Sequence, residues 1–157
     1  QRFAKREQMY RAYYDAEAQL LLPQDSNGRT YRGVHANRFD ETTRRFYEEG
    51  TALQYLFMVP HDTPGLMSLL GGPEMLSARL DKYFSEPVEL AAAGAQQDLE
   101  TGNLGGHCQG NEPGHHTPYL YNLAGRPDKA QEVLWKLMRM YSDNPDGLPG
   151  NDDVGQQ

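Results

Sequence analysis

Carboxylate, imidazole and amide side chains gather at three turns of the sequence. The three groups are Glu48 and Glu49, then Asn111, Glu112, His115 and His116, and finally Asn151, Asp152 and Asp153. Two carboxyl groups that converge on one pocket can hydrolyse a glycosidic bond, because one protonates the leaving oxygen while the other activates water or attacks the sugar. Carboxylate and amide oxygens can also hold a hard cation such as calcium. These turns are therefore the candidate functional sites.

Each group of carboxylates also has a purely structural interpretation. Glu48 and Glu49 can be solvated helix charges, and the pair Asp152-Asp153 can cap a following helix. Glu112 is harder to explain in this way, since it precedes a proline in a turn flanked by glycines. We therefore favour a functional role for Glu112.

The histidines do not form a familiar metal motif. His115 and His116 are adjacent, and adjacent side chains rarely reach one ion; the sequence also has no H-E-x-x-H spacing. We expect His115, like His61, to brace a pocket wall through a hydrogen bond. Metal-dependent phosphohydrolases hold a His-Asp dipeptide inside a helix. In this chain prolines flank the corresponding pair, His61-Asp62, closely on both sides. It therefore belongs to a turn.

Two segments that contain these turns resemble one another. Residues 61–74 and 115–128 align without a gap, and His, Thr, Pro, two Leu, Gly and Pro coincide. Thr-Pro starts a helix and Gly-x-Pro separates two helices, so the pattern predicts αα-hairpins over about 63–85 and 115–142. Stacked hairpins of this kind gather their polar turns at one end. Capping residues alone could also produce the pattern.

The remaining chain predicts further helices and loops. We expect an amphipathic helix over residues 1–22, turns over 24–40, and a helix over 41–58 that Gly50 interrupts. A long connection follows over 86–114, and a turn-rich loop covers 144–155. No segment has the alternation of a strand, so the fold class is all-α, built from αα-hairpin repeats.

Composition limits the function further. The chain has 157 residues and a net charge of −7, with 38% apolar residues; its mean hydropathy is −0.80. No apolar run approaches the roughly 18 residues of a membrane span, and no basic stripe suits nucleic acid. Cys108 is alone, so no intrachain disulfide can form. The chain opens directly into a helical pattern and ends after a polar turn, which indicates a fragment of a larger polypeptide.

Four ordered motifs strongly resemble glycoside hydrolase family 92, the calcium-dependent exo-acting α-mannosidases. The resemblance runs from Phe39 to the last residue. The motifs are YEEGTALQY at 47–55, VPHD at 59–62, GNEPGHH at 110–116 and GLPGNDDVGQ at 147–156.

The resemblance implies a fold and a mechanism. Residues 1–157 would form part of an (α/α)6 toroid, the catalytic domain, without its closing helices and without the N-terminal β-sandwich that packs on it. The activity would be hydrolysis of terminal α-mannosides with inversion. The general acid would be Glu49 and the general base Asp153, with Asp152 the less favoured choice.

The resemblance also implies the substrate and metal contacts. Glu112 and Asn111 would line the pocket near the leaving-group sugar, and the remaining substrate-binding residues would be His115, His116 and Gln54. Calcium would bind the 2- and 3-hydroxyls of mannose, with Asn151 and Asp153 as its first candidate ligands. The partners would be a mannose-containing glycan and the remainder of the polypeptide, without which the chain would be inactive. The protein would be secreted or periplasmic.

Two positions depart from the family pattern. Leu53 stands where many members have tryptophan, so one aromatic pocket wall is missing. Asn111 stands where members that act on α-1,2 links tend to have histidine, which favours another linkage. The alternative function is a non-catalytic helical-repeat module that binds carbohydrate or a partner through the same turns.

Overall fold

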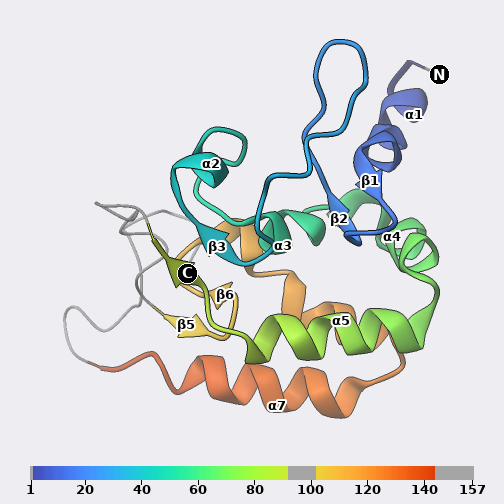
Figure 1. The fold of residues 1–157 in the computed structure, drawn as a ribbon. Coiled ribbons are helices and arrows are strands. Elements are labelled where there is room, and N and C mark those ends of the chain that lie inside the picture. Colours follow the sequence, from blue (N-terminus) through green and yellow to red (C-terminus); the bar gives the residue numbers. More distant parts are fainter. Residues whose placement is uncertain (1, 92–101, 144–157) are drawn as a thin grey trace.

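The computed structural model describes residues 2–91 and 102–143, and helices make up about half of them (Figure 1). The α-helices are α1 (Arg2–Glu7), α2 (Glu41–Arg44), α3 (Ala52–Leu56), α4 (Thr63–Leu70), α5 (Pro73–Ser85), α6 (Leu120–Leu123) and α7 (Pro127–Met138). The short 3₁₀ helices are η1 (Met9–Tyr13), η2 (Pro60–Asp62), η4 (Glu112–Gly114) and η5 (Thr117–Tyr119).

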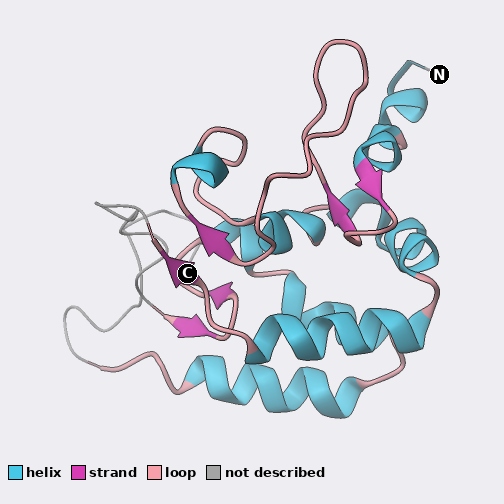
Figure 2. Ribbon diagram, viewed as in Figure 1, coloured by secondary structure: helices cyan, strands magenta, loops and turns pink. Residues whose placement is uncertain are grey.

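Short strands join the helices, so the all-α prediction holds only in part (Figure 2). β1 (Tyr14–Asp15) pairs antiparallel with β2 (Leu20–Leu21), β3 (Arg38–Phe39) pairs parallel with β4 (Glu89–Leu90), and β5 (Asn103–Leu104) pairs antiparallel with β6 (His107–Cys108). Strands of two residues are too short to show an alternating pattern. The connection predicted over 86–114 therefore holds three strands and η4 among its described residues.

Both predicted helical hairpins are present. In the first, α4 ends at Gly71, whose φ of 101° is left-handed, and α5 begins at Pro73. In the second, α6 is followed by Gly125 with a φ of 69°, and α7 begins at Pro127. In Figure 1, α5 and α7 lie along one another and run in the same direction, and Lys129 of α7 forms an ion pair with Asp81 of α5. That the two hairpins are copies of one unit stays a prediction.

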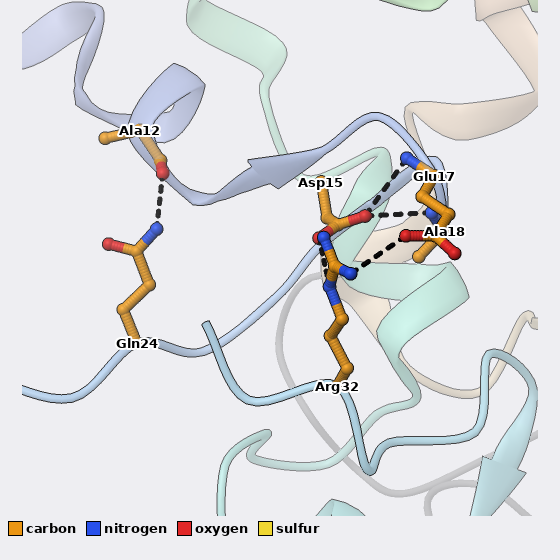
Figure 3. A network of polar contacts seen from close by, with 6 residues as sticks. All are labelled: Ala12, Asp15, Glu17, Ala18, Gln24 and Arg32. Carbon is orange, nitrogen blue, oxygen red and sulfur yellow. Dashed lines mark hydrogen bonds and ion pairs between the residues drawn. The ribbon is translucent and has the colours of Figure 1, made fainter. Parts of the chain in front are cut away.

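The helix predicted over residues 1–22 is wrong beyond residue 13, because the chain reverses there. Asp15 accepts hydrogen bonds from the N–H groups of Glu17 and Ala18 (3.0 and 2.9 Å), and these local bonds compete with a helix. The Arg32 side chain reaches back to Asp15 and Glu17, as Figure 3 shows. This network holds the loop after β2 against the β1–β2 turn, and the bond from the Ala18 N–H is the main reason why the pKa of Asp15 is lowered.

The core lies among α3, α4, α5, α6 and α7. Its fully or nearly buried side chains include Leu53, Leu56, Leu66, Leu76, Leu80, Tyr83, Leu120, Tyr121, Ala130, Val133 and Leu137. Val133 and Leu137 place one face of α7 in this core, whereas Trp135 and Met138 are each 64% exposed. No helix in the described part of the chain is both long and apolar enough to cross a bilayer.

Candidate active site

The turn that carries Glu49 divides the helix predicted over 41–58. Glu49 has a φ of 47°, a left-handed conformation that costs free energy for any residue with a side chain. Thr51 then begins α3 with a capping box: its hydroxyl accepts from the N–H of Gln54 at 3.3 Å, and the Gln54 side chain accepts from the N–H of Thr51 at 2.8 Å. Local side chains therefore fix where the turn ends and the helix starts.

The Tyr55 hydroxyl closes this turn from the side of α3. It accepts a hydrogen bond from the N–H of Glu48 at 3.1 Å and donates one to the carbonyl of Glu48 at 2.8 Å. The Tyr55 ring meets the ring of Tyr47 edge to face at 4.9 Å, and burial raises the pKa of Tyr55. Glu48 is exposed whereas Glu49 is half-buried, so Glu49 is the better candidate of the two for a catalytic carboxyl group.

Asn111 joins the second predicted group to the first. Its side-chain Nδ2–H donates to the carbonyl oxygen of Glu49 at 2.8 Å, although the two residues are 62 apart in the sequence. Both line a hollow of ≈ 10 Å³, together with Gln54, Met58, Tyr83, Cys108 and Gly114. That volume holds about one water molecule, so the hollow formed by the described residues is too small for a sugar ring.

Glu112 follows Asn111 at the start of η4 and has a buried oxygen, Oε2, with no hydrogen-bond partner among the described residues. A buried carboxylate oxygen without a partner is costly. Such a group is consistent with an acceptor for a sugar hydroxyl or with a ligand for a cation.

His107 is a buried support for the loop that carries Asn111 and Glu112. Its ring is fully buried; Nδ1 accepts from the Tyr83 hydroxyl at 3.2 Å, and Nε2–H donates to Gln109 Oε1 at 2.9 Å. The Gln109 amide donates in turn to the Tyr141 hydroxyl at 2.8 Å. Burial lowers the pKa of His107 to about 4, so the ring is neutral near pH 7. The neutral ring suits this pattern of one donor and one acceptor.

The histidine pair predicted at 115–116 braces the same loop. His115 Nε2 donates to the carbonyl of Gln109 at 2.9 Å, and His116 Nε2 approaches the carbonyl of Phe57 at 2.7 Å. The hydrogen bond expected for His115 is present, while contact of His115 and His116 with substrate stays a prediction. His61 likewise donates to a carbonyl, that of Glu7, at 3.0 Å, and lies in the short turn predicted for it. Neither His115 nor His116 shares a group of three metal-binding side chains with other described residues.

Gln54, predicted to bind substrate, uses its amide inside the protein. Its oxygen caps α3, and its Nε2–H donates to the carbonyl of Gly106 at 2.9 Å. The side chain is buried. Its observed contacts tie the β5–β6 turn to α3, and a contact with substrate stays a prediction.

The third predicted group lies outside the described residues. The proposed bases Asp153 and Asp152, and the proposed calcium ligand Asn151, all fall in 144–157. The described part of the chain contains no group of three or more His, Cys, Asp or Glu side chains that could hold a metal ion. The calcium prediction therefore depends on residues outside the described part of the chain and stays a prediction.

Sequence reasoning missed the supporting residues Tyr55, His107 and Tyr83. The capping box of Thr51 and Gln54 was readable from T-x-x-Q, and it would have placed the start of α3 correctly. No local signal identifies the other contacts, because Tyr83 lies 24 residues before His107. Gly105 marks the close approach at this point: a Cβ there would lie 2.4 Å from the backbone of Phe84.

Comparison with known families gives these features a context. The family described as "Glycosyl hydrolase family 92 catalytic domain" matches residues 1–157. The chain belongs to glycoside hydrolase family 92, as the four motifs predicted.

Relatives with a known structure agree with this assignment. A family GH92 alpha-mannosidase from Bacteroides thetaiotaomicron, in complex with mannoimidazole, is 31% identical with a TM-score of 0.79, and the match covers 94% of this chain and 20% of that one. A second structure of that enzyme gives a TM-score of 0.74 at 30% identity, over 94% of this chain and 18% of the other.

A curated fungal relative is similar over a shorter stretch. An "uncharacterized secreted glycosidase" of Arthroderma benhamiae is 33% identical over 110 residues, which is 69% of this chain and 12% of that protein. The chain thus spans about a fifth or less of the relatives that it matches.

Proposed function

We propose that the protein to which this chain belongs hydrolyses terminal non-reducing α-mannosides of glycans with inversion. The observation that carries the proposal is the hydrogen bond from Asn111 to the carbonyl of Glu49. It joins the turn of the predicted acid to the loop predicted to meet the leaving-group sugar. Membership of family 92 and the likeness to a bacterial α-mannosidase support the same conclusion.

In this proposal the residues divide the reaction between them. Glu49 gives its proton to the glycosidic oxygen as that bond breaks, while Asp153, or in its place Asp152, removes a proton from the attacking water. Inverting enzymes hold these two carboxyl groups about 6.5–9.5 Å apart so that water fits between them. Glu112 accepts a hydrogen bond from the leaving-group sugar through Oε2, which has no partner among the described residues. Asn111, His115, His116 and Gln54 shape that wall, and the residue at 111 favours links other than α-1,2.

Calcium belongs to the proposal with Asn151 and Asp153 as its ligands. When bound, it would polarise the 2- and 3-hydroxyls of mannose and favour a distorted ring. We further propose that residues 1–157 are part of an (α/α)6 toroid, since α5 and α7, the second helices of neighbouring hairpins, run in the same direction (Figure 1). The fungal relative is named as secreted, which supports a secreted or periplasmic location. The chain by itself should be inactive, because the remaining polypeptide supplies the rest of the toroid.

The test uses the full-length protein and the variant Glu49→Gln. We expect the unaltered protein to release the β-anomer first from an aryl α-mannoside, as proton NMR would record, and to lose activity reversibly with EDTA. Glu49→Gln should lower kcat on a methyl α-mannoside by about 10²–10⁴-fold, because it removes general acid catalysis, while mannoside binding by calorimetry persists. Unaltered turnover in the variant would refute the role of Glu49. Binding without turnover by the unaltered protein would indicate the carbohydrate-binding module instead.

A further inference from the structure

We propose that Tyr55 and Asn111 are positioning residues for the general acid. Together they hold the backbone of Glu48 and Glu49 in the left-handed turn that sets the direction of the Glu49 side chain. The inference rests on the proposed function, in which Glu49 is the acid, and adds two residues that act through it.

The backbone of Glu49 adopts a left-handed conformation. A glutamate with a φ of 47° adopts a conformation that the isolated chain disfavours, so surrounding contacts must maintain it. The next residue, Gly50, lies close against α3: a Cβ there would be 3.0 Å from the Tyr55 ring and 3.1 Å from Gln54 Oε1. Glycine at 50 therefore allows the turn to lie directly over Tyr55.

Tyr55 of α3 holds the backbone of Glu48. One hydroxyl, that of Tyr55, binds both the N–H and the carbonyl of Glu48, at 3.1 and 2.8 Å. Two bonds to one peptide residue fix both its position and its rotation. The ring that carries the hydroxyl is held in turn by the buried Tyr47.

Asn111 holds the backbone of Glu49 from the 107–116 loop. Asn111 is 6% exposed, and its amide donates to the carbonyl of Glu49 at 2.8 Å. Its loop is fixed by His116, which approaches the carbonyl of Phe57 just after α3 at 2.7 Å. The turn is thus held between α3 and the 107–116 loop.

Both contacts act on backbone atoms and leave the carboxyl group of Glu49 unchanged. Loss of either one should move the carboxyl group and not remove it. Such a change impairs proton donation to a poor leaving group, whereas a leaving group that departs without a proton is little affected. This difference separates a positioning role from a general loss of structure.

The experiment compares full-length Tyr55→Phe and Asn111→Ala with the unaltered protein on two substrates, methyl α-mannoside and α-mannosyl fluoride. For the methyl glycoside we expect kcat/KM to fall at least about tenfold, a part of the 10²–10⁴-fold that general acid catalysis contributes. For the fluoride we expect a fall of less than about threefold, since fluoride needs little protonation. Tyr47→Phe is the matched control, because its hydroxyl donates to the carbonyl of Leu21 at 2.7 Å and does not touch the turn.

Each outcome decides the inference. Equal losses on both substrates in Tyr55→Phe and Asn111→Ala, or the same selective loss in Tyr47→Phe, would overturn it. If one variant fails to fold by circular dichroism, the other variant alone decides. Glu49→Gln serves as the reference: if it shows no selective loss on the methyl glycoside, the proposed function fails. If Glu49→Gln shows the selective loss while Tyr55→Phe and Asn111→Ala do not, only the positioning role of Tyr55 and Asn111 fails.

Discussion

The turns that open the two helical hairpins occupy equivalent places in the sequence and yet contact different parts of the protein. At the first turn, Asp62 accepts hydrogen bonds from Gln8 at 2.9 Å and Tyr10 at 2.8 Å and caps α4 through the N–H of Gly65 at 3.0 Å. At the second turn, His116 aligns with Asp62 and approaches the carbonyls of Phe57 and Pro113. The first turn anchors the N-terminal segment, and the second anchors the candidate active-site loop.

This difference shows which residues form the hairpin and which determine its contacts with distant parts of the chain. Both turns are followed by Thr-Pro, a left-handed glycine and a proline that begins the next helix. These shared residues define the hairpin through local preferences. The residues that differ, aspartate at 62 and histidine at 116, select the distant partners of each turn.

The largest expected difference between the two turns is their response to acid. His107 supports the second turn, and its folded pKa of about 4 lies below the ordinary value of 6.5. The unfolded loop therefore binds the proton more tightly, so the stability that neutral His107 gives is complete above about pH 6.5 and falls by about 1.4 kcal/mol for each pH unit toward pH 4. Hydrogen exchange of residues 107–116, corrected for intrinsic rates, should show this slope.

The first turn should not share that slope. Hydrogen bonds from Tyr10 and Gln8 lower the pKa of Asp62 from its ordinary 3.8, so the carboxylate stays charged throughout the window from pH 6.5 to 4. Its contribution is lost only as the pH falls further, through the folded pKa. His107→Gln should abolish the slope in the second turn. A slope of equal size in both turns would contradict the comparison.

Removal of each turn's anchor should affect different properties. We expect His116→Gln to lower kcat/KM of the full-length protein by about 10–100-fold, since a loop displaced by about 1 Å costs up to about 10²-fold in rate. Asp62→Asn is the matched change: an amide nitrogen cannot accept the hydrogen bonds from Gln8 and Tyr10, so the N-terminal segment should undergo faster hydrogen exchange. The Asn oxygen still caps α4, and kcat/KM should stay within about twofold because residue 62 lies outside the site. Asp62→Asn with the larger loss of activity would reverse the assignment of the two turns.

The smallest effect concerns the glycines that the hairpins share. Gly125 has a φ of 69° and open space where a Cβ would lie, so Ala there should cost about 1–2 kcal/mol. Gly71 has a φ of 101°, further than Gly125 from the left-handed minimum near about 57°, so Gly71→Ala should cost more. Thermal unfolding of the two variants measures the difference, and a greater loss from Gly125→Ala would show that backbone strain does not set the cost at these two turns.

The hairpins could be predicted from the sequence because their signals are local. Thr-Pro and Gly-x-Pro lie within the elements that they start and stop. The resemblance to family 92 implied roles for Glu49 and Glu112, and those roles stay predictions. The left-handed break at Glu49 could not be predicted, because it depends on Tyr55 in the following helix and on Asn111, 62 residues away. The pairing of β3 with β4 likewise joins residues about 50 apart, and two-residue strands carry no periodic pattern.

The most direct test of the account is a crystal structure of the full-length protein with a non-hydrolysable α-mannoside and calcium. We predict that a Glu49 carboxyl oxygen lies about 2.6–3.2 Å from the glycosidic heteroatom. The carboxyl group of Asp153 or Asp152 should lie about 6.5–9.5 Å from that of Glu49, across the anomeric carbon. A bound mannoside that contacts neither Glu49 nor the 110–116 loop would contradict the account.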